Sequence, residues 1–157
     1  MKTIIVLTDL SDLTFKVLKQ AHTLAAAFHS QVIILHVVTK EPVVFDVGLA
    51  SPTILQTPSK ETPSKETLEK HYAQLLDLSD SLNKFGVSAS VEQLDDASVE
   101  NVLAETRRLG ADLIILGSHH HSTLYRMLVG TVTDDVLKHA HCPVLVVPGD
   151  VKPSEKT

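Results

Sequence analysis

Short runs of hydrophobic residues recur along the chain and alternate with polar stretches of helical spacing. Four runs are continuous and are predicted to be strands, at residues 3–7, 32–38, 113–116 and 144–147. A fifth run, residues 87–91, alternates between hydrophobic and small polar residues and is predicted to be a middle strand. Because the continuous runs contain no regular polar positions, we expect them to be covered on both faces, as in a parallel sheet.

Helices are predicted between these strands, because hydrophobic residues there recur three or four positions apart. The expected inward faces are Phe15, Leu18, Ala21, Leu24, Ala25 and Phe28; then Leu68, Tyr72, Leu75, Leu76, Ser79 and Leu82; then Val102, Leu103 and Thr106; and a last helix spans residues 132–139. Ser98 is predicted to cap the third helix, and Pro143 ends the fourth. The pattern predicts one α/β domain at residues 1–149, with a doubly wound parallel sheet of five strands, and a tail at residues 150–157.

Residues 41–66 depart from this alternation. They contain four of the seven prolines and a tandem repeat, Thr-Pro-Ser-Lys-Glu, at residues 57–61 and 62–66. A polar, proline-rich segment without hydrophobic period predicts a surface excursion from the domain. It is interpreted either as a tolerated insertion or as a lid or docking loop, and the insertion is favoured.

Composition excludes several classes of protein. The 157 residues carry a net charge of −5, which gives no electrostatic case for a nucleic-acid partner. The single cysteine, Cys142, excludes an intrachain disulfide and a cysteine-based zinc site. No hydrophobic run is long enough to span a membrane, and Asp9 interrupts the first run too early for a signal peptide. A soluble cytoplasmic protein with no membrane association is expected.

The segment from Gly117 to Thr131 carries the most chemical information. A glycine leaves a buried strand there, and a Gly130-Thr131 pair precedes the last predicted helix. Glycine allows close backbone approach, and the free amide groups at a helix start bind phosphate oxygens, so the segment is a candidate anion cradle. A strand exit and an ordinary helix cap explain the same residues. In an open parallel sheet the ligand lies beyond the carboxyl ends of the strands, where strand order reverses. If the first and fourth strands are neighbours, Thr8 and Asp9 face Leu116 and Gly117 across that crevice.

The chain resembles the universal stress protein family from Ile4 to Val147. The resemblance is carried by Ile4-Ile-Val-Leu-Thr-Asp-Leu-Ser11, Val32-Ile-Ile-Leu-His-Val-Val38, Gly110-Ala-Asp-Leu-Ile-Ile-Leu-Gly-Ser-His119, Leu128-Val-Gly-Thr-Val-Thr133 and His141-Cys-Pro-Val-Leu-Val-Val147. It implies a five-stranded, Rossmann-like sheet of order 3-2-1-4-5. It also implies a homodimer formed through the last strand, which agrees with the need to cover an exposed sheet edge.

The nucleotide-binding branch of that family has a motif of Gly, two residues, Gly, nine residues, then Gly followed by Ser or Thr. Gly117 and Gly130-Thr131 match this spacing, whereas His120 replaces the middle glycine. The resemblance implies an adenine nucleotide, ATP or AMP, with Mg²⁺ as a companion of ATP. The implied binding residues are Thr8, Asp9, Val37, Leu116, Gly117, His120, Gly130, Thr131 and Val132.

His120 leaves the function open in one respect. Its side chain could occupy the space of the outer phosphates, or its protonated ring could attract them. A nucleotide-binding stress-response regulator that acts on an unknown protein partner is favoured. The alternatives are a nucleotide-free interaction protein whose pocket His120 blocks, and a slow ATPase. No P-loop and no nucleophile motif is present, so no catalytic residue is assigned. The adjacent residues His119, His120 and His121 cannot all face one ion, so no metal site is assigned.

Overall fold

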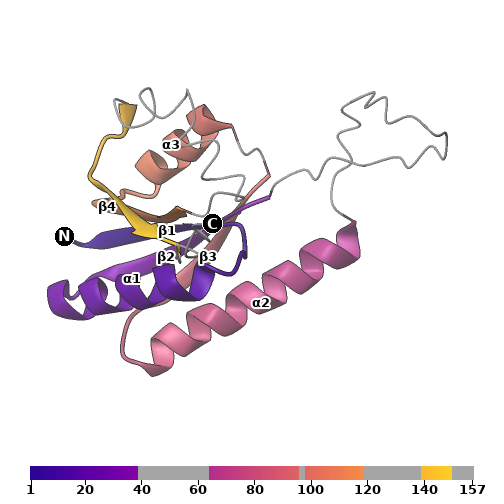
Figure 1. The fold of residues 1–157 in the computed structure, drawn as a ribbon, viewed down its shortest axis with the longest axis horizontal. Coiled ribbons are helices and arrows are strands. Elements are labelled where there is room, and N and C mark those ends of the chain that lie inside the picture. Colours follow the sequence, from indigo (N-terminus) through magenta and orange to yellow (C-terminus); the bar gives the residue numbers. More distant parts are fainter. Residues whose placement is uncertain (39–63, 96–97, 119–138, 150–157) are drawn as a thin grey trace, which may run out of the picture.

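The computed structural model describes residues 1–38, 64–95, 98–118 and 139–149. Within these ranges the chain forms five strands and three helices (Figure 1). In chain order they are β1 (Thr3–Thr8), α1 (Thr14–Phe28), β2 (Gln31–Val37), α2 (Lys65–Lys84), β3 (Ala89–Leu94), α3 (Val99–Arg108), β4 (Leu113–Ser118) and β5 (Val144–Pro148). The predicted helix at residues 132–139 lies, apart from His139, outside the described residues, as do residues 41–63 and 150–157 of the predicted excursion and tail.

The strands form one parallel sheet in the order β3-β2-β1-β4-β5, which confirms the predicted order. Helices α1 and α2 cover one face of the sheet, and α3 covers the other (Figure 1). Successive residues of β1 therefore enter different cores. Ile4 and Val6 pack with α1 and α2, whereas Ile5 and Leu7 pack on the side of α3. All six residues of β1 are buried, as expected for a central strand with helices on both faces.

The inward faces of two helices differ from the prediction at their edges. Phe15 and Phe28 of α1 are exposed, and so are Tyr72 and Leu76 of α2. The buried residues are Thr14, Val17, Leu18, Ala21 and Ala25 in α1, and Leu75, Ser79 and Leu82 in α2. The spacing identified the helices correctly. However, a stripe of hydrophobic residues wider than the contact with the sheet leaves its outer members in solvent.

Strand β3 begins two residues later than predicted, at Ala89. The chain first completes the end of α2, where the backbone N–H of Val87 donates to the carbonyl oxygen of Leu82 at 3.0 Å. The Asn83 side chain then clamps the strand entrance. Its Oδ1 accepts from the N–H of Ala89 at 3.0 Å, and its Nδ2 donates to the carbonyl of Ala89 at 3.1 Å. Pairing with β2 starts at the carbonyl oxygen of Ser88, which accepts the N–H of Val32, and the clamp holds the adjoining Ala89 to the end of α2.

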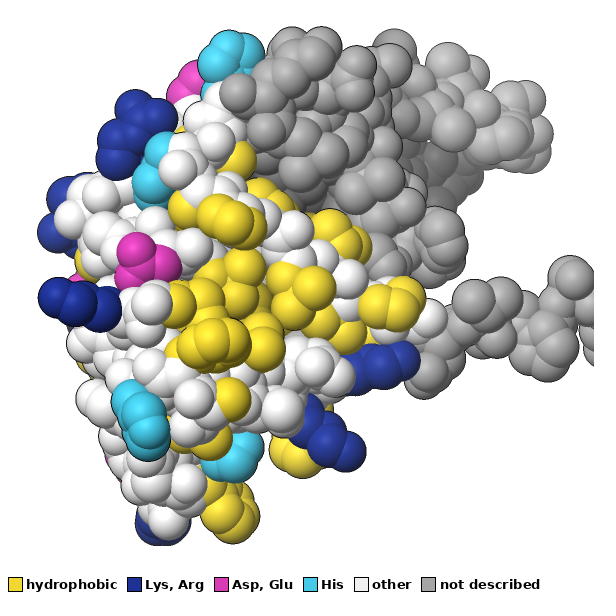
Figure 2. Space-filling view, turned by 90° about the vertical axis from the view of Figure 1, so that its left-hand side faces the viewer, with side chains coloured by type: hydrophobic (Ala, Val, Ile, Leu, Met, Phe, Trp, Pro, Cys, Tyr) yellow, Lys and Arg dark blue, Asp and Glu magenta, His cyan; other side chains and the backbone are white. Residues whose placement is uncertain are grey.

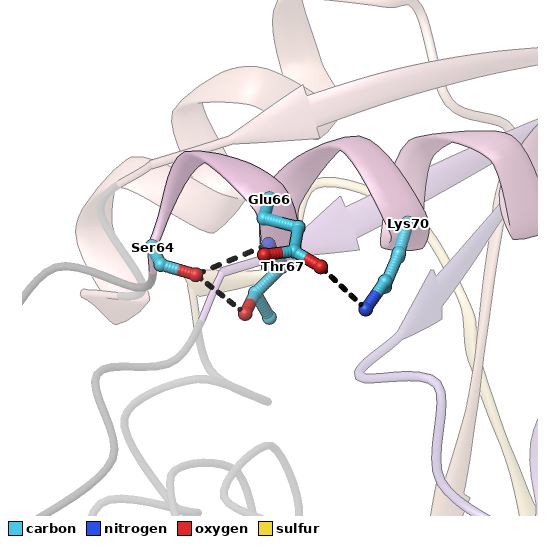
Figure 3. Close-up of polar contacts among 4 residues, drawn as sticks. All are labelled: Ser64, Glu66, Thr67 and Lys70. Carbon is cyan, nitrogen blue, oxygen red and sulfur yellow. Dashed lines mark hydrogen bonds and ion pairs between the residues drawn. The ribbon is translucent and has the colours of Figure 1, made fainter.

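The last three residues of the second repeat, residues 64–66, form the start of α2 (Figure 3). Ser64 is the N-cap: its Oγ accepts from the backbone N–H of Thr67 at 3.2 Å. Lys70 Nζ lies 2.9 Å from Oε1 of Glu66 one turn away, an exposed ion pair. Residues 64–66 were predicted to belong to the excursion and instead begin the helix, because a serine followed by a charged first turn is a good helix start. None of the helices in the described ranges is both long and apolar enough to cross a membrane, and the 20 residues of α2 are largely polar.

Candidate functional site

Thr8 ends β1 and joins it to the first turn of α1. Its side chain is 3% exposed, and its Oγ1 lies 2.8 Å from Oγ1 of Thr14. The same oxygen accepts the backbone N–H of Leu10 at 3.0 Å. A buried hydroxyl needs such partners, because an unsatisfied polar group in a core is costly. Thr8 thereby fixes the path of the chain between the strand and the helix.

The turn after Thr8 holds an unfavourable backbone conformation. Leu10 has φ of 59°, a value that residues with a side chain adopt rarely. Asp9 supports this turn, because its Oδ1 accepts the N–H of Ser11 at 3.0 Å. Asp9 therefore caps this turn, and one carboxylate oxygen suffices for it. Such strain persists only where neighbouring bonds hold it, and it is frequent at binding sites.

Gly117 lies in β4 directly against the start of α1. A Cβ built there would lie 3.0 Å from Cδ1 and 3.1 Å from Cβ of Leu13, and 3.3 Å from Cγ2 of Val17. Close helix packing thus requires glycine at this position. The sequence interpretation had considered only approach to a phosphate or a strand exit, and the packing requirement is a finding of the structure.

These residues surround one small hollow at the carboxyl edge of the sheet. It is lined by Leu7, Thr8, Asp9, Ser11, Leu13, Thr14, Val17 and Gly117. Its volume is about 10 Å³, which is room for a single water-sized group. Strands β1 and β4 are hydrogen-bonded neighbours, so the hollow lies where strand order reverses. The predicted meeting of the β1 end with Gly117 is therefore present.

The other predicted residues have different positions. Val37, 0% exposed, pairs with Leu94 of β3, and Leu116, 2% exposed, packs in the core on the side of α3. Neither side chain lines the hollow. His120, Gly130, Thr131 and Val132 lie outside the described residues, as does His119–His121 as a group. Their roles stay predictions.

A pair of histidines, one buried and one half-buried, adjoins the hollow and was not singled out from the sequence. His36 of β2 is the register neighbour of Thr8 and is 2% exposed. Its ring meets that of His71 from α2 edge to face, with 5.4 Å between ring centroids. Gln93 Nε2 of β3 lies 3.4 Å from Nδ1 of His36. The available signal was a histidine inside an otherwise continuous hydrophobic run, where a polar ring must find partners.

The pKa of His36 is lowered to about 4, chiefly by burial and secondly by the nearby ring of His71, while the carboxylate of Asp9 acts in the opposite direction. His36 is therefore neutral near pH 7. An amide NH₂ can only donate, so in this orientation Nδ1 of His36 accepts and the ring hydrogen resides on Nε2. Within the described ranges, no three side chains of the histidine, cysteine or acidic types are grouped to hold a metal ion.

The fold and this hollow define a class: a doubly wound α/β protein with a hollow at the β1–β4 junction, on the carboxyl edge where open parallel sheets generally bind ligands. The family model of the universal stress protein family matches residues 1–148. A universal stress protein of Methanocaldococcus jannaschii is 31% identical over 146 residues, covering 93% of this chain and 81% of that one. The chain belongs to the universal stress protein family.

Solved structures agree with this assignment. A universal stress protein from Burkholderia pseudomallei is 26% identical, with a TM-score of 0.63 and coverage of 94% of this chain and 96% of that one. Two others share the fold at lower identity. One is a universal stress protein in complex with cAMP, with 22% identity, a TM-score of 0.61 and coverage of 94% and 96%. The second, from Archaeoglobus fulgidus, is in complex with dAMP, with 17% identity, a TM-score of 0.59 and coverage of 94% and 97%.

Proposed function

We propose that this protein binds an adenine nucleotide at the carboxyl edge of the sheet and responds to it as a regulator in the stress response. The carrying observation is the convergence of Thr8, Asp9 and Gly117 around one hollow at the β1–β4 junction. Similar proteins bound to cAMP and dAMP support the ligand class. The hollow itself is too small for a base, so it would receive only one group of the ligand, and the rest would lie outside it.

In the proposal, different residues of the site contact different parts of the nucleotide. Asp9 offers a carboxylate that can accept hydrogen bonds from a ribose or an amino group. Leu13 and Val17 take the space that a Cβ of Gly117 would fill, so in the proposal Gly117 offers the phosphate only its backbone groups. In the proposal, Val37 contributes its backbone near the base and Leu116 lines the pocket. His120, Gly130, Thr131 and Val132 complete the phosphate side, with Mg²⁺ accompanying ATP.

Calorimetric titration with ATP, ADP and AMP tests the proposal directly. We expect micromolar binding by the native protein and a loss of at least about tenfold in Asp9→Ala, because a charge-assisted hydrogen bond contributes on the order of 1.5 kcal/mol or more. Asp12→Ala is the matched control, since Asp12 is an exposed aspartate three residues along the same segment that does not line the hollow. Equal affinities of the two variants would exclude Asp9 as a ligand.

His120 decides between the proposal and its nucleotide-free alternative. Binding that appears only in His120→Gly would mean that the histidine closes the pocket, and the protein would then be an interaction module. Slow ATP hydrolysis is examined in the same preparation. Phosphate release abolished by both Asp9→Ala and Gly130→Ala would establish an ATPase.

The proposed regulator acts as a homodimer paired through β5. This strand is at the edge of the sheet, and Val146 on it is 40% exposed. An uncovered edge presents backbone groups that a second copy could pair with. Sedimentation velocity of the native protein, compared with Val146→Lys, tests this. A dimer that persists unchanged in the variant would exclude pairing centred on this part of β5.

A further inference from the structure

Helices α1 and α2 enclose an apolar groove on the surface of the sheet layer that they cover. It is lined by Phe15, Leu18, Lys19, His22, Leu78, Ser81, Leu82 and Phe85, and its volume is about 280 Å³. It shares no residue with the hollow at the carboxyl edge. The groove is therefore separate from the candidate nucleotide site.

Exposed hydrophobic side chains are a general feature of this molecule. On the face drawn in Figure 2 they gather in the centre, with lysine and arginine side chains at the margins. Across the described residues the two most exposed large hydrophobic side chains are Phe15 and Phe85, at 75% and 76%. Both line the groove, one from each helix. Exposing two phenylalanine rings on either side of one concavity has a hydrophobic cost that a bound apolar group would remove.

Buried leucines form the base of the groove, and a ring contact fixes one of its sides. Leu18 and Leu82 are 5% and 6% exposed and belong to the core beneath it. The ring of His22 meets that of Phe85 edge to face, with 6.1 Å between centroids. Nε2 of His22 also lies 3.4 Å from the carbonyl oxygen of Phe85, so a hydrogen on this nitrogen would be donated to it. These contacts hold the phenylalanine at the end of α2 beside α1.

Among the lysine, arginine and acidic residues of the described ranges, only Lys19 lies on the lining of the groove. Helix α1 contains no acidic residue, and its Lys19 and His22 lie on the lining. The acidic residues nearest in sequence on α2, Asp77 and Asp80, are not part of the lining. At about 100° per residue, Asp80 is directed well away from the face that carries Leu78 and Leu82, whereas Asp77 lies one turn from Ser81 at the flank of that face. An anion at the rim would thus meet a lysine without a carboxylate of the lining opposing it.

The volume of the groove indicates what kind of ligand it can hold. The volume is close to the lower limit of small-molecule pockets, about 300 Å³. A stable protein partner needs a much larger contact, on the order of 1,000 Å² in total. We propose that this groove binds a small amphipathic anion, a carboxylate with a medium-length hydrocarbon chain. The chain would lie between Phe15 and Phe85, and the carboxylate would face Lys19.

The test uses decanoate below its micelle concentration, with decanol as an uncharged ligand of equal chain length. Binding to the full chain is followed by calorimetry and by NMR shifts of the α1 and α2 amides. Phe15→Ala is paired with Phe28→Ala, an exposed phenylalanine on the same helix that is outside the groove. Lys19→Gln is paired with Lys84→Gln, which removes the same charge from outside the lining. All four side chains lie outside the core, and thermal unfolding confirms that each variant is folded.

The expected result is that decanoate binds more tightly than decanol and shifts amides of both helices. Phe15→Ala and Lys19→Gln should each weaken decanoate binding at least about fivefold, whereas their controls change it less than twofold. Equal binding of decanol and decanoate, or equal effects of each variant and its control, would overturn the proposal. Capture by anionic phospholipid vesicles without binding of monomeric decanoate would also overturn it, and would indicate a membrane surface instead.

Discussion

Acidification should destabilise this protein through His36. The residue is neutral in the folded state because its pKa is lowered to about 4, principally by burial. In the unfolded chain a histidine has a pKa near its ordinary value of about 6.5. Between these two values the unfolded state binds one more proton than the folded state, so stability must fall as the pH falls. The contribution is fully present above about pH 6.5 and is lost as the pH falls toward 4.

The size of the effect follows from the difference between the folded and unfolded pKa values of His36. Each pH unit between the two pKa values contributes about 1.36 kcal/mol, so the full interval corresponds to roughly 3 kcal/mol. Burial accounts for most of this value, and the groups that face His36 adjust it. His71 of α2 opposes the charged form, Asp9 after β1 favours it, and Gln93 of β3 presents an amide donor to Nδ1. A stability of 5–15 kcal/mol is typical of a domain, so a loss of about 3 is readily measured.

Urea unfolding at a series of pH values from 4.5 to about 7.5 provides the measurement. The native protein and His36→Gln are compared, because acidic side chains common to both contribute equally and cancel in the difference. The free-energy difference between them should change by about 2 to 3 kcal/mol across the series. His29→Asn is the control; it removes an exposed histidine with φ of 54°, a conformation that asparagine tolerates. Parallel pH profiles of the native protein and His36→Gln would refute the reasoning.

Four further single substitutions test the packing, a backbone turn and the capping contacts. Gly117→Ala should cost about 1 to 3 kcal/mol by overpacking against Leu13, and Leu13→Ala in the same chain should reduce that added cost in a double-mutant urea cycle. At Gly110 φ is 70°, and a Cβ built there would meet no neighbouring atom within 4 Å. Gly110→Ala should therefore cost only about 1 kcal/mol, from backbone strain. Asn83→Ala should cost about 1 to 3 kcal/mol, since both hydrogen bonds to the start of β3 disappear. Ser64→Ala should cost about 1 kcal/mol and fray the first turn of α2, as hydrogen exchange would show; unchanged exchange there would contradict the cap.

The sheet could be predicted from the sequence because its central strands have few alternatives. Continuous runs such as residues 3–7 and 113–116 fit only a strand that is covered on both faces. Where strand β3 begins and which helix residues are exposed were harder to predict from the sequence. The start of β3 is held by the Asn83 clamp, a contact that no hydrophobic period reveals. The exposure of Phe15 depends on how far α2 lies from α1, which is a tertiary property.

The candidate site was predictable to a different degree at each residue. Asp9 and Gly117 could be placed together as soon as β1 and β4 were taken as neighbours, because parallel strands end at the same edge. The packing of Gly117 against Leu13 could not, since a glycine in sequence carries no sign of which neighbour requires it. The contacts of His36 could not be predicted for a related reason: its partners Gln93 and His71 come from elements distant in the chain.

The two edges of the sheet differ in how closely they follow ordinary folding rules. At the amino edge, Asp112 Oδ2 accepts the N–H groups of Lys2 at 2.6 Å and Thr3 at 3.0 Å, which lowers the pKa of that exposed carboxyl and simply fastens β1 to β4. A positive φ and a buried hydroxyl occur at both edges, at His29 and Ser30 on the amino side and at Leu10 and Thr8 on the carboxyl side. The carboxyl edge alone adds a buried, neutral histidine beneath a helix, among the described residues. Each of these costs free energy that regular packing would avoid. Departures of this kind concentrate where a protein binds or reacts. The carboxyl edge is therefore where binding of a ligand would offset these free-energy costs, an argument that does not depend on similarity to other proteins.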